Sequence, residues 1–207
     1  MNYDMDLKLE QVFERLQHPS LPEDIIVAYE PLDVDIFGGD IDASESITGS
    51  ILIKKSADAY LGIEKIDVFT QKYEKPKAFV NGEELSVSFS HTNGALAASL
   101  SWNMNVGIDM EEKERKINSR LLSRMKHPEE SDSLYEETDL IRVWTLKEAA
   151  LKMIGTGLRK PMNGTLIKKI DKNSFIVQFD DGKQGKICSF QHQDHWISIC
   201  YHNNAVT

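Results

Sequence analysis

Two acidic residues, Asp109 and Glu111, are separated by one position in a stretch that is predicted to be a strand. Alternate side chains of a strand share a face, so these carboxylates would project together while Ile108 and Met110 point into the core. Adjacent carboxylates repel each other unless a proton or a cation joins them, and a hard divalent cation such as Mg²⁺ suits such a pair. The alternative is that the strand ends here and that water surrounds both acids, as it does most surface carboxylates.

A second group, Trp144, Glu148 and Lys152, has the spacing of one face of a helix that is predicted over 138–154. An exposed Glu–Lys pair at this spacing would contribute only about 0.3 kcal/mol. Trp144 and the apolar stretch Ala149–Leu151 indicate instead that the helix is largely buried. A carboxylate and an ammonium group on its inward side would then need partners. A metal ion with phosphate oxygens would supply partners for both.

The elements that must position these residues are predicted from apolar periodicity and turn signals. Helices are predicted over 5–17, 47–61, 112–126 and 138–154, and strands over 25–29, 65–69, 86–90, 95–101, 105–109, 166–170, 175–179, 185–190 and 196–201. Residues 37–46 are predicted to form a loop, and so are residues 127–139, which hold six acids and no Lys or Arg. The Asn-Gly pairs at 81–82 and 93–94 are typical of hairpin turns.

The sequence contains a weak internal repeat. Residues 79–82 (Phe-Val-Asn-Gly) precede 88–91 (Ser-Phe-Ser-His), and residues 179–182 (Phe-Asp-Asp-Gly) precede 189–192 (Ser-Phe-Gln-His). Hairpin turns reuse a few residue types, so chance is one explanation. The other is a pair of α/β lobes related by pseudo-symmetry, in which case the cleft between the lobes is the natural site.

Composition excludes several classes of protein. The 207 residues are 41% hydrophobic and 28% charged, which favours one globular domain or two closely packed lobes. The net charge of −9 argues against a nucleic-acid binder, although residues 1–48 carry −10 of it and residues 49–207 carry +1. No apolar run approaches the ~20 residues of a membrane span, and no signal peptide is predicted. Two cysteines without zinc-like spacing favour a cytoplasmic protein.

Taken together, five segments resemble one family, the 4′-phosphopantetheinyl transferase superfamily. The likeness is to its larger, surfactin-synthetase-activating type, a holo-carrier-protein synthase. Each segment is weak alone, but their order and spacing are specific. The matching segments are Ile47–Lys54, Lys75-Pro76, Phe89–Gly94, Gly107–Glu111 and Trp144–Ala149, the last continuing through Lys152–Leu158 to Pro161.

The resemblance implies a fold and an activity. The fold would be α/β (α+β), with two pseudo-symmetric lobes that each pack a small three-stranded antiparallel sheet on a long helix. We expect an N-terminal lobe over 1–104 and a C-terminal lobe over 105–207, in one compact unit with the active site between them, so that a monomer suffices. Members of the family transfer the 4′-phosphopantetheine arm of coenzyme A to a carrier-protein serine and release adenosine 3′,5′-bisphosphate.

The resemblance also implies roles for individual residues. Three acids would hold Mg²⁺, or Mn²⁺, against the pyrophosphate: Asp109, Glu111 and Glu148. The catalytic residues would be Glu148, Lys152 and His91, with either Glu148 or Glu111 as the base. For His91, the residues alone leave open the alternative of a turn histidine that has no functional role. Coenzyme A would contact Lys75, Pro76, Ser90, His91, Lys152 and Ser46.

The carrier partner is expected to be acidic. Residues Lys113–Lys126 hold six bases and one acid, so this segment is predicted to dock the carrier, the alternative being a solvated basic face.

Two departures from the family concern coenzyme A. Glu74 replaces a glycine that many relatives have, and residues 40–45 are acidic where relatives often carry bases. Lys54, Lys55 or Lys77 would then have to contact the 3′-phosphate.

The departures leave two alternatives open. One is a non-catalytic relative that binds coenzyme A or a carrier protein as a regulatory module. The other is an ordinary α/β domain whose acids are surface residues, in which case the Asp109 and Glu148 carboxylates would lie far apart.

Overall fold

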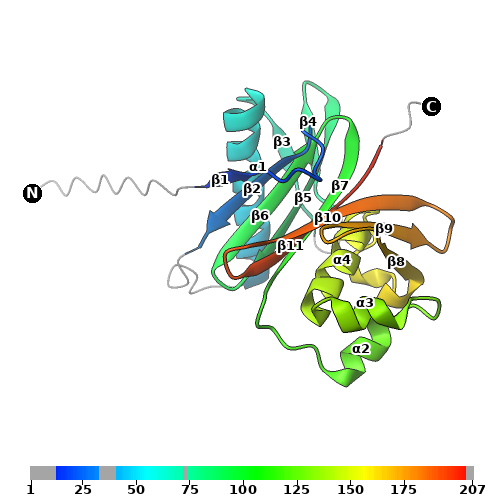
Figure 1. Ribbon diagram of the computed structural model, residues 1–207. Coiled ribbons are helices and arrows are strands. Elements are labelled where there is room, and N and C mark those ends of the chain that lie inside the picture. The colour runs from blue at the N-terminus through cyan, green and yellow to red at the C-terminus, as the bar shows by residue number, and fades with distance from the viewer. Residues whose placement is uncertain (1–12, 33–40, 72–73, 204–207) are drawn as a thin grey trace, which may run out of the picture.

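A computed structural model describes residues 13–32, 41–71 and 74–203. These residues form two antiparallel sheets, each with a long helix packed against it (Figure 1). None of the helices in the described ranges is long and apolar enough to cross a membrane.

The first sheet has the strand order β1-β2-β6-β5-β4-β3. Its strands are β1 (Glu14–Leu16), β2 (Ile26–Pro31), β3 (Asp67–Phe69), β4 (Lys77–Val80), β5 (Glu83–Thr92) and β6 (Ala95–Ser101). Helix α1 (Ile41–Leu61) covers one face, where Leu52 and Ala57 share a core with Leu85 and Val87. The apolar spacing over 47–61 predicted this buried face of the helix.

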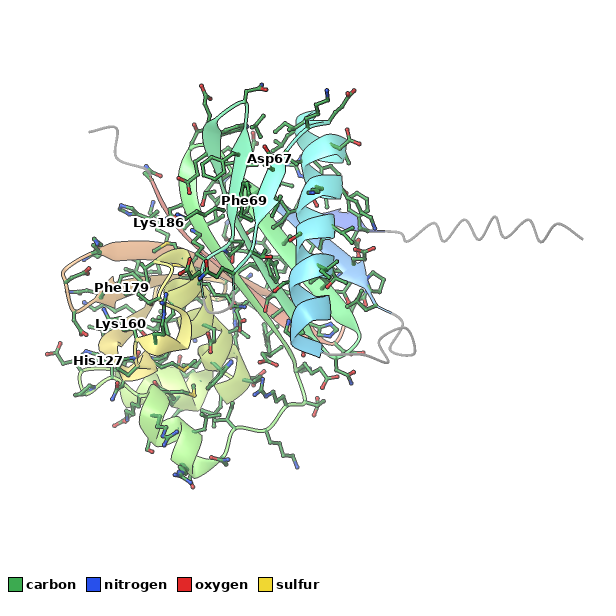
Figure 2. The ribbon with its side chains drawn as sticks, turned by 180° about the vertical axis from the view of Figure 1, so that it is seen from behind. Asp67, Phe69, His127, Lys160, Phe179 and Lys186 are labelled. Atoms are coloured by element: carbon green, nitrogen blue, oxygen red, sulfur yellow. The ribbon has the colours of Figure 1, made fainter. Side chains whose placement is uncertain are left out.

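The second sheet has the strand order β7-β11-β10-β9-β8. Its strands are β7 (Met104–Glu112), β8 (Thr165–Lys169), β9 (Ser174–Phe179), β10 (Gln184–His192) and β11 (His195–Asn203). Helix α4 (Leu140–Met153) packs on it, accompanied by the short helices α2 (Ser119–Met125) and α3 (Asp132–Glu137) and the 3₁₀ turns η2 (Gly157–Arg159) and η3 (Met162–Gly164). From behind, Lys160 and Phe179 lie in this half and Asp67 and Phe69 in the other (Figure 2).

The two halves repeat one topology. Without β1, the orders β2-β6-β5-β4-β3 and β7-β11-β10-β9-β8 correspond strand by strand. The repeated hairpins turn at Gly82 and Gly182, whose φ angles are 87° and 83°, a region that side chains other than glycine rarely adopt. The sequence repeat therefore reflects structure and is not chance. The predicted boundary at 104/105 stays a prediction; the chain passes from one sheet to the other between Ser101 and Met104.

The two sheets pack face to face. A shared core lies between them, with Val27 and Tyr29 from the first sheet against Ile108, Met110 and Ile197 from the second. The helices cover the outer faces, so the layers run from α1 through the two sheets to α4. This arrangement brings the edge strand β7 beside β5, where the predicted site residues lie.

Several predictions about the elements are wrong. The helix predicted over 5–17 is replaced in its described part by strand β1, whose Leu16 pairs with Val27; residues 5–12 lie outside the described ranges. Pairing with the edge of β2 buries Leu16, and this long-range contact outweighs the helical spacing. Each sheet also has more strands than the three that the resemblance implied.

The helices around the site begin and end elsewhere than predicted. The helix expected over 112–126 shortens to α2, because β7 runs on to Glu112 and Asn118 caps the helix by accepting from the Leu121 amide at 2.9 Å. The loop expected over 127–139 contains α3. Helix α1 begins at Ile41, inside the loop expected over 37–46; no Gly or Pro interrupts residues 41–48.

Candidate active site

Strand β7 places Asp109 and Glu111 on the face that α4 covers. Ile108 and Met110 are fully buried on the other face, between the two sheets, as the strand period predicted. Asp109 is buried, with 5% of its surface exposed, so its carboxylate is not a solvated surface group.

Gly107 allows α4 to approach β7 closely. A Cβ atom at this position would lie 2.2 Å from the backbone nitrogen of Met153 and 2.3 Å from the carbonyl oxygen of Ala149. The only side chain small enough is therefore a hydrogen atom. Because Gly107 lies two positions before Asp109 on the same face, the close contact brings the second half of α4 over that carboxylate.

Lys152 joins α4 to both neighbouring strands. Its Nζ donates to Oδ1 of Asp109 at 2.7 Å and to the hydroxyl of Ser90 at 2.8 Å, and lies 3.5 Å from the carbonyl oxygen of Phe89. The ammonium group thus lies where β5, β7 and α4 meet. The helix prediction placed Lys152 and Glu148 on one face, and the structure directs that face at the junction of the two sheets.

A row of hydroxyls, here called the serine seam, connects β5 to β7. Its members alternate along β5 and each accepts a backbone amide of β7. Ser86 accepts from Val106 at 3.0 Å, Ser88 from Ile108 at 3.1 Å, and Ser90 from Met110 at 3.3 Å. β7 is the edge strand of its sheet, so these amides point away from β11 and need partners. The seam supplies them and holds the two halves together.

The carboxylates at the junction interact electrostatically. Burial and the neighbouring charges of Asp109 and Glu111 together raise the pKa of Glu148 to about 7, against the opposing charges of Lys152 and Arg115. Burial likewise raises the pKa of Glu111, opposed by its hydrogen bond from Arg115. Asp109 and Glu148 are both buried, and the charge of Asp109 raises the pKa of Glu148, which argues against the alternative of distant surface acids.

The same residues fit a hard divalent cation. Oδ2 of Asp109 is buried and has no hydrogen-bond partner in the described part of the chain. A cation bound there would be a partner for this oxygen, and it would favour the ionised form of the neighbouring Glu148. No three acids, histidines or cysteines among the described residues converge as a metal site, and Glu111 is paired with Arg115.

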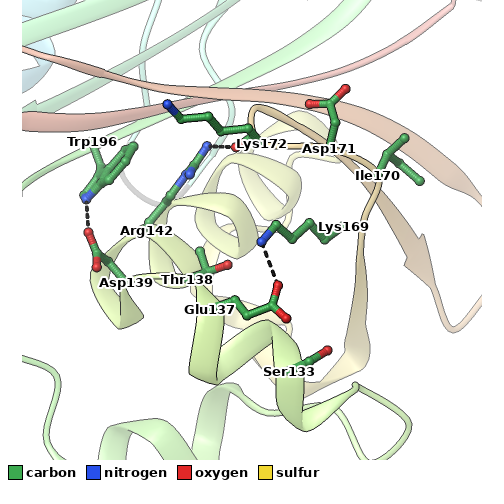
Figure 3. Close-up of a pocket in the computed structure, with 10 residues that line it drawn as sticks. All are labelled: Ser133, Glu137, Thr138, Asp139, Arg142, Lys169, Ile170, Asp171, Lys172 and Trp196. Atoms are coloured by element: carbon green, nitrogen blue, oxygen red, sulfur yellow. Dashed lines mark hydrogen bonds and ion pairs between the residues drawn. The ribbon is translucent and has the colours of Figure 1, made fainter.

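A separate pocket of about 640 Å³ lies at the other end of α4 (Figure 3). None of the predicted site residues lines it. Its charged groups pair with their neighbours: Lys169 donates to Glu137 at 3.0 Å, and the Trp196 indole donates to Asp139 at 3.0 Å. The pocket is therefore distinct from the junction that holds Asp109 and Lys152.

Part of the chain is similar to known proteins. A model of the 4′-phosphopantetheinyl transferase superfamily matches residues 105–200, the part that carries all three acids and Lys152. Residues 105–200 are thus similar to this superfamily. The chain is also 29% identical over 143 residues to the 4′-phosphopantetheinyl transferase gsp of Aneurinibacillus migulanus. That alignment covers 66% of this chain and 59% of the relative's length, so the chain spans less than two thirds of that protein.

The residues with expected coenzyme A roles in this superfamily are more dispersed. Lys75 is largely buried, and its Nζ donates to Asn105, to the Met153 carbonyl oxygen at 3.1 Å and to Ser86 at 3.4 Å. Burial lowers the pKa of Lys75 to about 8. The ammonium group of Lys75 therefore connects α4 to the seam, and Pro76 follows it half-buried before β4.

His91 and Ser46 lie away from the carboxylates. His91 is an exposed residue of β5 and shares a face with Phe89, which packs against Gly49 of α1; Ser90 points to the opposite face. Ser46 is half-buried in α1, where its carbonyl oxygen accepts from the Ser50 hydroxyl at 2.7 Å. The structure thus gathers Asp109, Glu148 and Lys152, with Ser90, and places His91 and Ser46 on the α1 side.

Sequence reasoning missed two contributors. Arg115 pairs with Glu111 and lies 5.5 Å above the Trp144 ring, so it controls whether Glu111 is available. The seam serines Ser86 and Ser88 were also missed, although their alternation with Ser90 was visible in the sequence. Glu111 lies only four residues before Arg115, but the sequence gave no sign of the contact between Arg115 and Trp144 of α4.

Lys147 belongs to the matched segment Trp144–Ala149, but its role in the structure is to stabilise the fold. Its side chain is completely buried, and Nζ donates to Glu130 at 2.6 Å and to the Thr165 carbonyl oxygen at 2.6 Å. Glu130 also accepts from the Ile167 amide at 2.8 Å. This ion pair connects α4 to β8 on the side away from Asp109.

Proposed function

We propose that the protein transfers the 4′-phosphopantetheine arm of coenzyme A to a serine of an apo-carrier protein. The serine oxygen forms a bond to the β-phosphorus of the pyrophosphate, and the bond from that phosphorus to the bridging oxygen breaks. Adenosine 3′,5′-bisphosphate leaves with the electron pair, and the serine proton goes to a protein carboxylate. We further propose that the protein acts as a monomer in the cytoplasm, where its two free cysteines stay reduced.

The observation that carries this proposal is the Oδ2 atom of Asp109, which has no partner among the described residues and lies next to Glu148 and Lys152. Asp109, Glu111 and Glu148 would hold Mg²⁺, or Mn²⁺ in its place. Bound there, the cation would neutralise charge that develops on the pyrophosphate during phosphoryl transfer. For Glu111 to join, its carboxylate must leave Arg115, which would then be free to contact a phosphate or a carrier.

Glu148 is the proposed base. A pKa of about 7 matches a group that accepts a proton near neutral pH, and its burial beside Lys152 keeps it in place. Glu111 is the other possible base. Lys152 would stabilise the non-bridging phosphate oxygens by exchanging its 3.5 Å contact to Phe89 for one of them. His91 would contact the nucleotide phosphates from the α1 side.

For the remainder of coenzyme A we propose the side that α1 covers, with Ser46, His91 and Pro76. Lys75 would contact a phosphate only after exchanging one of its three present acceptors. Lys54 and Lys77 are exposed and form no ion pair with an acid in the described part of the chain, whereas Lys55 donates to Glu30 at 2.9 Å. Lys54 or Lys77 is thus the better-placed replacement for the missing bases at 40–45.

The direct test is a mass-gain assay with purified protein, coenzyme A, Mg²⁺ and several apo-carrier proteins. We expect one carrier to gain the mass of phosphopantetheine, and we expect Asp109→Ala and Glu148→Ala to abolish the gain while circular dichroism shows an intact fold. Glu137→Ala removes an exposed acid of α3 and serves as the matched control that retains activity. A protein that modifies no carrier and binds no coenzyme A would disprove the proposal.

The second candidate is a non-catalytic relative that binds coenzyme A or a carrier protein as a regulatory module. The observation that favours it is that Lys75 donates its hydrogen bonds to groups of the protein itself and that the acidic Glu74 lies beside it. Tight binding of coenzyme A without turnover on any of the carriers would establish it. Retention of all three acids and Lys152 argues for catalysis, because a module that only binds needs no base at the junction.

We also propose that the segment Lys113–Lys126 docks an acidic carrier protein. Arg120 and Arg124 on α2 and Lys116 before it are exposed, whereas Lys126 is paired with Asp132. Reversing charge with Arg120→Glu and Arg124→Glu should raise KM for the carrier and leave KM for coenzyme A unchanged. Equal kinetics in the variants would assign the segment to a solvated face.

A further inference from the structure

The three serines of the seam differ in one respect. All accept a backbone amide of β7, but only Ser90 also donates to a carboxylate, Oδ1 of Asp109, at 2.9 Å. Ser88 accepts from the Ile108 amide and is also buried, yet no hydrogen bond joins it to an acid of the described residues. Any special role of Ser90 must therefore come from Asp109 and not from the seam itself.

The hydroxyl of Ser90 has no hydrogen-bonding capacity left. A serine hydroxyl has one proton and two lone pairs. Its proton goes to Oδ1 of Asp109, and its lone pairs accept from the Met110 amide at 3.3 Å and from Lys152 Nζ at 2.8 Å. A direct contact from this hydroxyl to coenzyme A would require the loss of one of these bonds.

The consequence for Asp109 is an asymmetric carboxylate. Oδ1 accepts from both Ser90 and Lys152, whereas Oδ2 is buried without a partner in the described part of the chain. Two donors on one oxygen fix the carboxylate's rotation, so they also determine where the other oxygen points.

We propose that Ser90 is a positioning residue for a divalent cation: it orients the Asp109 carboxylate so that Oδ2 is presented to the cation. This inference deepens the proposed function and rests on the metal site within it. The serine comes from β5 and the carboxylate from β7, so a cation-ready Asp109 exists only when the two halves of the protein are packed together. A role for Ser90 in contacting coenzyme A is the competing assignment.

The test is titration of the full chain with MgCl₂ in the absence of coenzyme A, followed by calorimetry. Loss of a group that hydrogen-bonds a metal ligand weakens metal binding by about 10- to 100-fold, and we expect Ser90→Ala to show at least about a 10-fold loss. Ser90→Thr retains the hydroxyl and should restore most of the affinity. If Ser90→Ala does not fold, Ser90→Cys replaces it, because a thiol keeps the volume but bonds weakly.

Two matched controls separate positioning from packing. Ser88→Ala removes a seam hydroxyl that contacts no acid, and Ser99→Ala removes a buried hydroxyl without a partner in the described residues. Both should bind Mg²⁺ within about 2-fold of the unchanged protein. Undiminished binding by Ser90→Ala, an equal loss in Ser88→Ala, or no Mg²⁺ binding by the unchanged protein would each overturn the inference.

The transfer assay distinguishes this inference from the proposed function. If Mg²⁺ binds and depends on Ser90 while no carrier gains mass, the proposed function fails and the positioning role stands. If the carrier is modified and Ser90→Ala raises only KM for coenzyme A, with Mg²⁺ binding unchanged, the proposed function stands and Ser90 is a coenzyme A contact.

Discussion

The Nζ atom of Lys152 lies 2.7 Å from Oδ1 of Asp109, and this ion pair connects α4 to the edge strand β7. The pair occupies one oxygen of the carboxylate, and the other oxygen has no partner within residues 13–32, 41–71 and 74–203. A helix, two strands and both halves of the protein therefore meet at one carboxylate, which makes its surroundings the most informative place for substitutions.

Substituting Lys152→Met should lower the free energy of unfolding and abolish transfer. The change leaves Asp109 buried without its cation, and we expect a loss of about 2 kcal/mol, below the value for a fully buried pair because 28% of the lysine side chain is exposed. Urea denaturation measures the loss. Lys169→Met, which breaks the more exposed pair with Glu137, should cost less than about 1 kcal/mol. Similar losses in both variants would contradict a special role for the Lys152 pair.

Substituting Gly107→Ala should displace α4 from β7. The added Cβ would meet backbone atoms of Ala149 and Met153 that cannot move aside independently, so we expect a loss of about 3 kcal/mol and of Mg²⁺ binding. Gly185→Ala is the control, since its nearest atoms are side-chain ends at 3.0 Å or more, which can shift. A Gly107→Ala protein as stable as the unchanged one would show that the helix contact is looser than described.

Because of Lys75, the free energy of unfolding should rise with pH in the alkaline range. Its pKa is lowered by burial from 10.5 to about 8, so between these values the unfolded chain holds a proton that the native lysine has released. Stability then increases with pH, by up to about 3 kcal/mol from this group. Below pH 8 both states hold the proton and the burial penalty is fully present.

The measurement for Lys75 is urea denaturation at about pH 7 and about pH 10, with Lys75→Met beside the unchanged protein. The variant should lack the rise attributed to Lys75, and the difference between the two proteins removes the titration of other groups. An identical pH dependence in both would show that the Lys75 ammonium is not buried as described.

Binding of Mg²⁺ near neutral pH should release a proton from Glu148. Because its pKa is about 7, about half of the Glu148 side chains carry a proton at pH 7, and cation binding requires the ionised form. Calorimetry in two buffers of different ionisation enthalpy measures the release, expected to be about half a proton at pH 7 and less at higher pH. Glu148→Gln should show none. Release that persists in the variant would assign the proton to another group.

Local pattern was enough to predict much of the site. The period of two placed Asp109 and Glu111 on one face, and the period of a helix did the same for Glu148 and Lys152. These relationships hold within one element, where backbone geometry alone determines which side chains point together. The same reasoning failed at 13–17 and at 113–118, where pairing with β2 and the continuation of β7 outweighed the local spacing.

The sequence by itself determined the chemistry that is present: the acids, the lysine, and the elements that carry them. Only the tertiary structure decided how these groups share their bonds. In the folded protein Lys147 forms a buried structural ion pair, whereas Lys152 pairs with Asp109. The Ser90 hydroxyl donates to the same Asp109 carboxylate, which lies on another strand. The physical reason is that contacts between residues far apart in the chain depend on how sheets and helices pack, here on the Gly107 contact and the serine seam.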